Sequence, residues 1–204
     1  MPVLHTVFAP LTIARKLAGE LLDHDLRDHP NAVMGALDAI TDTVIRYVAE
    51  VGKAGADGIF YASQTASRDV MAEGDHSRFS MPSSWRVLES LDGSPMWTML
   101  HVHGRQIYFD RSATLPVSAM NWHDRLTAPS LGDGLRRFRG AVVGGLNESQ
   151  TLRTGSPAAA AADVADAVSQ TAGTGVIIAP GCVLPLDVHE ENLEAVVSTA
   201  KSTR

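Results

Sequence analysis

The chain has 204 residues, of which 45% are hydrophobic and 20% are charged, and these values are typical of a globular protein with a sizeable core. Binding to nucleic acids or anionic membranes requires a broad basic surface, and the formal net charge of −6 argues against one. We therefore expect neither as a partner. Cys182 is the only cysteine, so we expect no internal disulfides. The N-terminus lacks a basic signal segment, and no apolar stretch is long enough to span a bilayer. We therefore expect a cytoplasmic protein.

Short apolar runs with strand character alternate with helical patterns along the first part of the chain. The first run, residues 3–10, precedes a helix predicted over residues 11–22. An apolar residue then recurs every third or fourth position from Val33 to Val51, which predicts a long amphipathic helix. A second strand is predicted at residues 58–63, and a polar, irregular stretch follows it.

The same alternation continues to the end of the chain. Helices are predicted over residues 83–91 and 189–202, and an alanine-rich helix begins with Ser156 as its N-cap and Pro157 at its first position. Four further strands are predicted, at residues 96–104, 115–122, 138–146 and 174–181. Nearly continuous apolar strands separated by helices indicate parallel βα units, which build either a doubly wound sheet or a (β/α)8 barrel.

The placement of polar residues favours the barrel. No G-x-G-x-x-G motif follows the first strand, and polar side chains gather just past the strand ends, as in the C-terminal face of a (β/α)8 barrel. These side chains are Ser63, Gln64, His101, His103, Asn121, His123, Asn147 and Cys182. We therefore predict an α/β fold of the (β/α)8 TIM-barrel type. Because the pattern accounts for about six βα units, we expect an N-terminal truncation by about two units.

The pair His101 and His103 is the strongest candidate for a metal site. Side chains two residues apart on a strand point to the same face, so the two imidazoles can share a ligand. Cys182 follows the last predicted strand, and two imidazoles with one thiolate suit zinc while leaving a coordination position open. The alternative is that the histidines are core residues and that Cys182 is a small buried hydrophobe.

Other polar residues are candidates for catalysis or substrate binding. His123 and Asp124 could serve as a general acid or base, or Asp124 could cap a turn beside a solvated His123. Four residues with hydroxyl or amide groups are candidates for substrate binding: Ser63, Gln64, Asn121 and Asn147.

Five segments, taken together, resemble the uroporphyrinogen decarboxylase (URO-D) superfamily along essentially the whole chain. They read FAPLTIARKLAGE, AGADGIFYASQTAS, LHVHG, GGLNESQTLRTG and GCVLPLDVHEENLEAV, and the last is the most specific. The resemblance implies a (β/α)8 barrel, of which residues 1–204 would form a single domain equivalent to the C-terminal part of the family fold.

Two branches of this family imply different chemistry. The decarboxylases have a histidine where this chain has Cys182, and their arginine and aspartate near the first two strands have no counterpart here. The zinc branch moves methyl groups between corrinoid proteins and thiols, and it uses a His-x-Cys pair with a distant cysteine. His101 and Cys182 match that pattern, whereas His103 replaces the middle cysteine.

The resemblance therefore implies an enzyme, favoured as a zinc-dependent, methyltransferase-like member with a corrinoid-bearing partner. Its substrate would be a small molecule: a tetrapyrrole, a thiol or a methyl donor. Uroporphyrinogen decarboxylation in porphyrin biosynthesis is the alternative activity. A third reading is an inactive remnant or a partner subunit, because an open barrel needs covering by a second copy or by a completing polypeptide.

Overall fold

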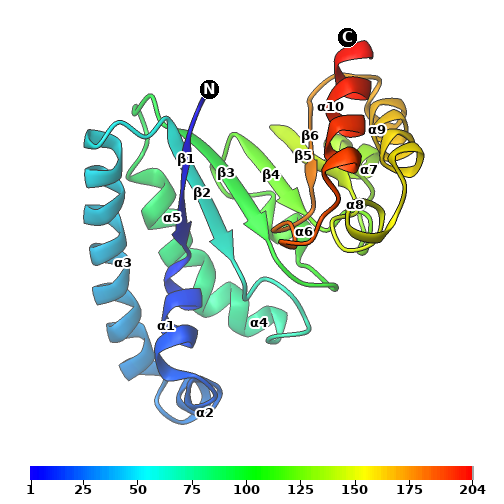
Figure 1. The fold of residues 1–204 in the computed structure, drawn as a ribbon. Helices are drawn as coiled ribbons and strands as arrows, with labels where there is room; N and C mark the ends of the chain where they lie inside the picture. Colours follow the sequence, from blue (N-terminus) through cyan, green and yellow to red (C-terminus); the bar gives the residue numbers. More distant parts are fainter. Residues whose placement is uncertain (204) are drawn as a thin grey trace.

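Six parallel strands form one sheet in which every strand lies next to its neighbours in sequence. The computed structural model describes residues 1–203, and its strand order is β1-β2-β3-β4-β5-β6. The strands are β1 (Leu4–Phe8), β2 (Gly58–Ser63), β3 (Trp97–Val102), β4 (Ala119–Trp122), β5 (Ala141–Leu146) and β6 (Val176–Pro180). All six predicted strands are confirmed, and the sheet curves so that β1 and β6 lie at opposite ends of it (Figure 1).

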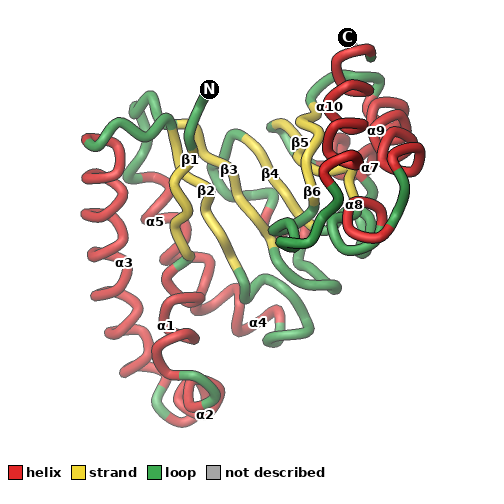
Figure 2. Tube along the Cα trace, in the orientation of Figure 1, coloured by secondary structure: helices red, strands yellow, loops and turns green. Residues whose placement is uncertain are grey.

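Helices connect successive strands, which gives the TIM-barrel-like βα arrangement that the sequence predicts. The helices before β3 are α1 (Pro10–Ala18), α2 (Leu21–Asp28), α3 (Pro30–Lys53), α4 (Glu73–Asp75), the π-helix η1 (His76–Ser80) and α5 (Met81–Glu89). Those after it are α6 (Phe109–Ser112), α7 (Leu131–Arg137), α8 (Thr151–Thr154), α9 (Pro157–Thr171) and α10 (Glu190–Ser202). The loops that follow β2, β3 and β4 lie on the same side of the sheet (Figure 2).

Two predictions about the N-terminal half need correction. The single helix predicted over residues 11–22 is two helices, because Gly19 takes a positive φ of 60° that ends α1. The stretch after β2, predicted as irregular, contains α4 and η1. The long helix predicted from its apolar stripe is confirmed as α3, whose buried residues include Val33, Val44 and Val51.

Local sequence explains how the alanine-rich helix begins. Ser156 has an extended backbone, and its side-chain oxygen accepts a hydrogen bond from the backbone N–H of Ala159. Pro157 occupies the first helical position, where a missing N–H costs nothing. The predicted N-cap and first residue of α9 are therefore confirmed.

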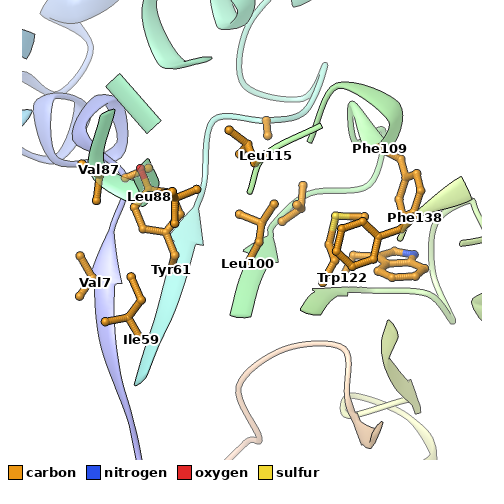
Figure 3. Packing of buried hydrophobic residues seen from close by; sticks show 14 of the residues in the cluster. Val7, Ile59, Tyr61, Val87, Leu88, Leu100, Phe109, Leu115, Trp122 and Phe138 are labelled. Carbon is orange, nitrogen blue, oxygen red and sulfur yellow. The ribbon is translucent and has the colours of Figure 1, made fainter. Parts of the chain in front are cut away.

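The main core lies between the sheet and the helices around it. Ile59 and Tyr61 of β2, Leu100 of β3 and Trp122 of β4 are all fully buried, and Figure 3 shows them with Val87 and Leu88 of α5. Because side chains alternate along a strand, the residues between these positions point to the opposite, concave face of the sheet. Among residues 1–203, no helix combines the length and hydrophobicity that crossing a bilayer requires.

Candidate metal centre

The strand register brings the candidate ligands to one face and one end of the sheet. His101 pairs with Ala62 of β2 and with Asn121 of β4, so these three residues form a row across the concave face. His103 lies one step beyond β3, and its backbone N–H donates to the carbonyl of Ser63. The alternation that buries Leu100 in the helix-facing core therefore directs both histidines to the concave face.

Three donor atoms converge there from two distant parts of the chain. The Sγ atom of Cys182, in the loop after β6, lies 3.8 Å from Nε2 of His101 and 3.7 Å from Nδ1 of His103. All three candidate ligand atoms lie within 4.8 Å of one another. Zinc bound at about 2.3 Å from sulfur and about 2.0 Å from nitrogen, with tetrahedral angles, needs a sulfur–nitrogen separation of about 3.5 Å. The donor set therefore fits zinc in chemistry, its two sulfur–nitrogen separations lie close to the tetrahedral value, and it leaves a fourth position open.

Asn121 fixes which nitrogen of His101 faces the cluster. The side-chain Nδ2 of Asn121 donates to the carbonyls of Val143 (2.9 Å) and Pro180 (3.1 Å), so its Oδ1 must face the other way. That oxygen lies 2.6 Å from Nδ1 of His101 and therefore requires a proton on that nitrogen. The Nε2 atom that faces Cys182 is then left with its lone pair, which is the form a metal requires.

The surroundings of His101 also restrict its ring. Only 5% of the residue is exposed, and the ring of Phe60 stacks against it with centroids 5.3 Å apart and an interplanar angle of 23°. Phe60 lies on the concave face one residue before Tyr61, which faces the helices. Packing from one side and a hydrogen bond at Nδ1 from the other hold the imidazole in a single orientation.

A histidine–glutamate pair borders the three donors. Nε2 of His123 lies 3.3 Å from Nδ1 of His103, and Nδ1 of His123 lies 2.8 Å from a carboxylate oxygen of Glu148. Interaction with the Cys182 thiolate, and then the hydrogen bond to Glu148, raise the pKa of His123 to about 9. Burial opposes ionisation of Glu148, but the His123 imidazole lowers the pKa of that carboxyl below its ordinary value.

The same neighbours act on the thiol. Burial acts to raise the pKa of Cys182, but interactions with the surrounding His101, His103 and His123 imidazoles outweigh burial and lower it to about 4. The half-buried Cys182 is therefore a thiolate at neutral pH even before a cation binds. A thiolate, and not a thiol, is the form that binds metal.

Asp124 lies in a different environment from its neighbour His123. Its Oδ1 accepts a hydrogen bond from the backbone N–H of Gly145, and only 2% of its side chain is exposed. Burial is the main reason that its pKa is raised to about 6. The adjacent Arg125 donates to the carbonyls of Gly145 and Asp163. These contacts join Asp124 and Arg125 to β5 and α9 and do not join them to the three donor atoms.

The residues predicted to bind substrate are distributed over several contacts. Ser63 is buried at the end of β2, and the backbone N–H of Gln64 donates to the hydroxyl of Thr12. Oδ1 of Asn147 accepts hydrogen bonds from the backbone N–H groups of Ser149 and Gln150, which shapes its own loop. Of the four predicted substrate-binding residues, Asn121 contacts a candidate ligand through its side chain, and Ser63 contacts His103 through its backbone carbonyl.

Sequence reasoning missed two residues of this centre. Glu148 directly follows Asn147 beyond the end of β5, so its position after a strand end was an available signal. Phe60 carried no such signal, because a phenylalanine inside a strand is an ordinary core residue until the register places it beside His101.

Fold and site together define a TIM-barrel-like α/β protein with a candidate transition-metal site at the carboxyl ends of its strands. The chain belongs to the uroporphyrinogen decarboxylase (URO-D) family, whose model matches residues 1–203. This match confirms the resemblance that the sequence motifs indicate.

Two curated relatives share the name methylcobamide:CoM methyltransferase MtbA. The relative from Methanosarcina acetivorans is 22% identical over 207 residues, which cover 99% of this chain and 58% of the relative. The relative from Methanosarcina mazei is 24% identical over 209 residues, which cover 100% of this chain and 59% of the relative. The chain therefore spans less than two thirds of the length of these relatives.

Solved structures show the same fold. A methyltransferase from Methanosarcina mazei superposes with a TM-score of 0.88 at 23% identity, covering 99% of this chain and 59% of that structure. A B12-independent methionine synthase from Shewanella sp. W3-18-1, in complex with selenomethionine, gives a TM-score of 0.67 at 11% identity and covers 100% and 61% of the two chains. At these identities the likeness establishes the fold alone.

Proposed function

We propose that this chain carries the metal centre of a zinc-dependent methyltransferase of the URO-D family that acts on a thiol. The observation that carries the proposal is the convergence of one ring nitrogen each of His101 and His103 with Sγ of Cys182, all within 4.8 Å of one another. Three protein donors with an open fourth position are typical of catalytic zinc sites, whereas structural sites have four protein donors. The names of the curated relatives support methyl transfer as the reaction class.

The proposed reaction transfers a methyl group from a methyl donor to a thiol. Zinc, when bound, would lower the pKa of a thiol that occupies the open position. The thiol proton is released to solvent, and the His123 imidazolium, whose charge is balanced by the Glu148 carboxylate 2.8 Å from Nδ1, stabilises the resulting thiolate. A bond then forms between the thiol sulfur and the methyl carbon, and the donor leaves with the electron pair of the broken bond.

The remaining side chains have supporting roles in this proposal. Asn121 and Phe60 hold the His101 ring so that Nε2 faces the ligand cluster. Asp124 fixes the end of β5 through Gly145, which positions the following Glu148. We propose a corrinoid-bearing protein as the methyl-donating partner, and residues 1–204 as one domain that a second copy or another polypeptide completes.

The presence of His103 in place of a second sulfur donor has a chemical consequence. An imidazole is neutral, so a two-histidine, one-cysteine centre carries one negative charge fewer than a centre with two cysteines. Zinc held by these donors would therefore withdraw more electron density from a bound thiolate, which would lower the nucleophilicity of that thiolate. We expect slower methyl transfer than a more thiolate-rich centre would give.

The test combines metal content with methyl transfer. Zinc is measured in the purified chain beside His101→Ala and Cys182→Ser, and methylation of a small thiol by free methylcobalamin is followed for each protein. The proposal requires about one zinc per chain, its loss in both variants, and parallel loss of methyl transfer. Exposed Arg46 on α3 supplies the control, because Arg46→Gln leaves every donor in place.

The alternative functions give different results in the same experiment. A folded chain that binds no zinc but consumes uroporphyrinogen would show decarboxylation in place of methyl transfer. A chain that binds zinc in the wild type and transfers no methyl group, alone or with added corrinoid protein, would be a remnant or a partner subunit.

A further inference from the structure

A cavity of about 640 Å³ lies beside the loops that follow β2, β3 and β4. Its charged lining consists of Arg68, Glu73, Arg105, Asp110, Arg111 and Arg137. Four arginines and two acids leave a surplus of two positive charges in a chain whose net charge is −6. The cavity is therefore a local exception to the charge of the molecule.

The two acids are already engaged by two of the arginines. Arg137 donates from Nε to Asp110 at 2.8 Å, and Arg111 lies 3.9 Å from Glu73. Within the described part of the chain, residues 1–203, Arg68 and Arg105 have no carboxylate within ion-pair distance of their side chains. The surplus charge is thus carried by two identifiable guanidinium groups.

The backbone of these two arginines is held in place while their side chains stay free. The Arg68 N–H donates to the carbonyl of Gln106 at 3.0 Å. The Arg105 N–H donates to the carboxylate of Asp69 at 2.6 Å, and the Arg105 carbonyl accepts a hydrogen bond from Thr127. Two unpaired guanidinium groups on anchored backbone at one cavity are suited to a ligand with several acceptor oxygens, which arginine binds in bidentate geometry.

The rest of the cavity wall is partly apolar. Phe109, Leu126 and Pro129 line it, and the guanidinium carbon of Arg137 lies 4.9 Å from the centre of the Phe109 ring. A bare inorganic ion would leave this apolar surface in contact with water. A ligand with an anionic group and an apolar group satisfies both parts of the wall.

We propose that this cavity binds an organic phosphate monoester, with the phosphate on Arg68 and Arg105 and the apolar group against Phe109 and Leu126. A phosphate monoester carries close to two negative charges at neutral pH, which matches the surplus of the lining. Sulfonates and carboxylates carry one negative charge and would leave one positive charge of the lining uncompensated. The site requires none of the three metal donors, so it does not depend on the proposed metal chemistry.

Isothermal titration calorimetry at low salt, with phenyl phosphate as the probe, tests this proposal on the chain of residues 1–204. Arg68→Gln combined with Arg105→Gln is expected to raise Kd for phenyl phosphate about tenfold or more. The matched control combines Arg46→Gln with Arg139→Gln, which removes the same charge from two exposed arginines outside the cavity lining. Kd in this control is expected to stay within about twofold of the wild type.

Further variants make the test independent of folding defects and of zinc. Asp110→Asn releases Arg137 from its ion pair and is expected to tighten phenyl phosphate binding. Cys182→Ser disrupts the metal centre and is expected to leave binding unchanged, which separates this cavity from zinc-bound phosphate. Equal weakening in both double variants, binding abolished by Cys182→Ser, or inorganic phosphate binding as tightly as phenyl phosphate would each overturn the proposal.

Discussion

Replacement of Asn121 by alanine tests how the candidate metal centre is held in its binding form. The Asn121 side chain makes three contacts, at 2.6 Å to His101, 2.9 Å to Val143 and 3.1 Å to Pro180. Without it, His101 can rotate or shift its proton to Nε2, and both changes remove the lone pair that faces Cys182. Loss of such a hydrogen bond behind a metal ligand costs about 10- to 100-fold in metal affinity.

The same substitution also destabilises the fold. Alanine leaves the carbonyls of Val143 and Pro180 without their Asn121 donor, and a buried polar group left unpaired costs about 1–3 kcal/mol. We expect Asn121→Ala to lower the free energy of unfolding by about 2–4 kcal/mol in the presence of a chelator. Urea unfolding followed by circular dichroism measures this loss, and competition with a chromophoric chelator measures the zinc Kd.

Asn192 offers a matched control. It is fully buried at the start of α10, and its Nδ2 donates to the carbonyls of Thr151, Leu152 and Gly155. Asn192→Ala should therefore destabilise the protein to a similar extent while leaving the zinc Kd unchanged. If both alanine variants weaken zinc equally, the loss reflects general destabilisation, and the argument from the His101 tautomer is refuted.

Three further predictions concern the thiolate, a buried carboxyl and a glycine. Because the pKa of Cys182 is about 4, alkylation of the metal-free protein by iodoacetamide should be nearly constant from pH 6 to pH 8. An ordinary thiol would react about 100-fold faster at the higher pH, and such a profile would contradict the lowered pKa. The pKa of Asp124 is raised to about 6 from 3.8, so ionisation destabilises the native state as pH rises through that range. Asp124→Asn should gain stability relative to the wild type between pH 4 and pH 6, on the order of 2 kcal/mol by urea unfolding, and a pH-independent difference would contradict the assignment. Gly145 has a φ of 98°, and an added Cβ would lie 2.6 Å from the Cβ of Ala167. We therefore expect Gly145→Ala to lower the free energy of unfolding by about 2 kcal/mol or more. An unchanged thermal unfolding temperature would refute this prediction.

Hydrophobic periodicity accounts for the success of the fold prediction. The buried strands appear in the sequence as short apolar runs, which predict strands. The apolar residues from Val33 to Val51 recur with the period of a helix that packs on one face. The break at Gly19 was less visible, because residues on both sides of it favour helix and only the positive φ of the glycine separates α1 from α2. Local preference therefore specifies most elements, and backbone geometry decides where some of them stop.

The candidate site was predictable only in part. Two-residue spacing on a strand is a local property, so His101 and His103 could be paired from the sequence alone. The contact between His123 and Glu148 joins residues 25 positions apart, and it depends on the loops after β4 and β5. No sequence period encodes such a contact, and the catalytic pairing of His123 with Asp124 remains a prediction.

The placement of Cys182 after β6 has a mechanical consequence. Within residues 1–203, β6 pairs with β5 alone, and Ile177 in it is 41% exposed, so this strand lies at an edge from which it can fray. His101 and Cys182 are 81 positions apart in the sequence. A cation bound to both would cross-link the loop after β6 to β3. Fraying of β6 would then require breaking a metal–sulfur bond, so loading with metal would slow amide exchange along that strand.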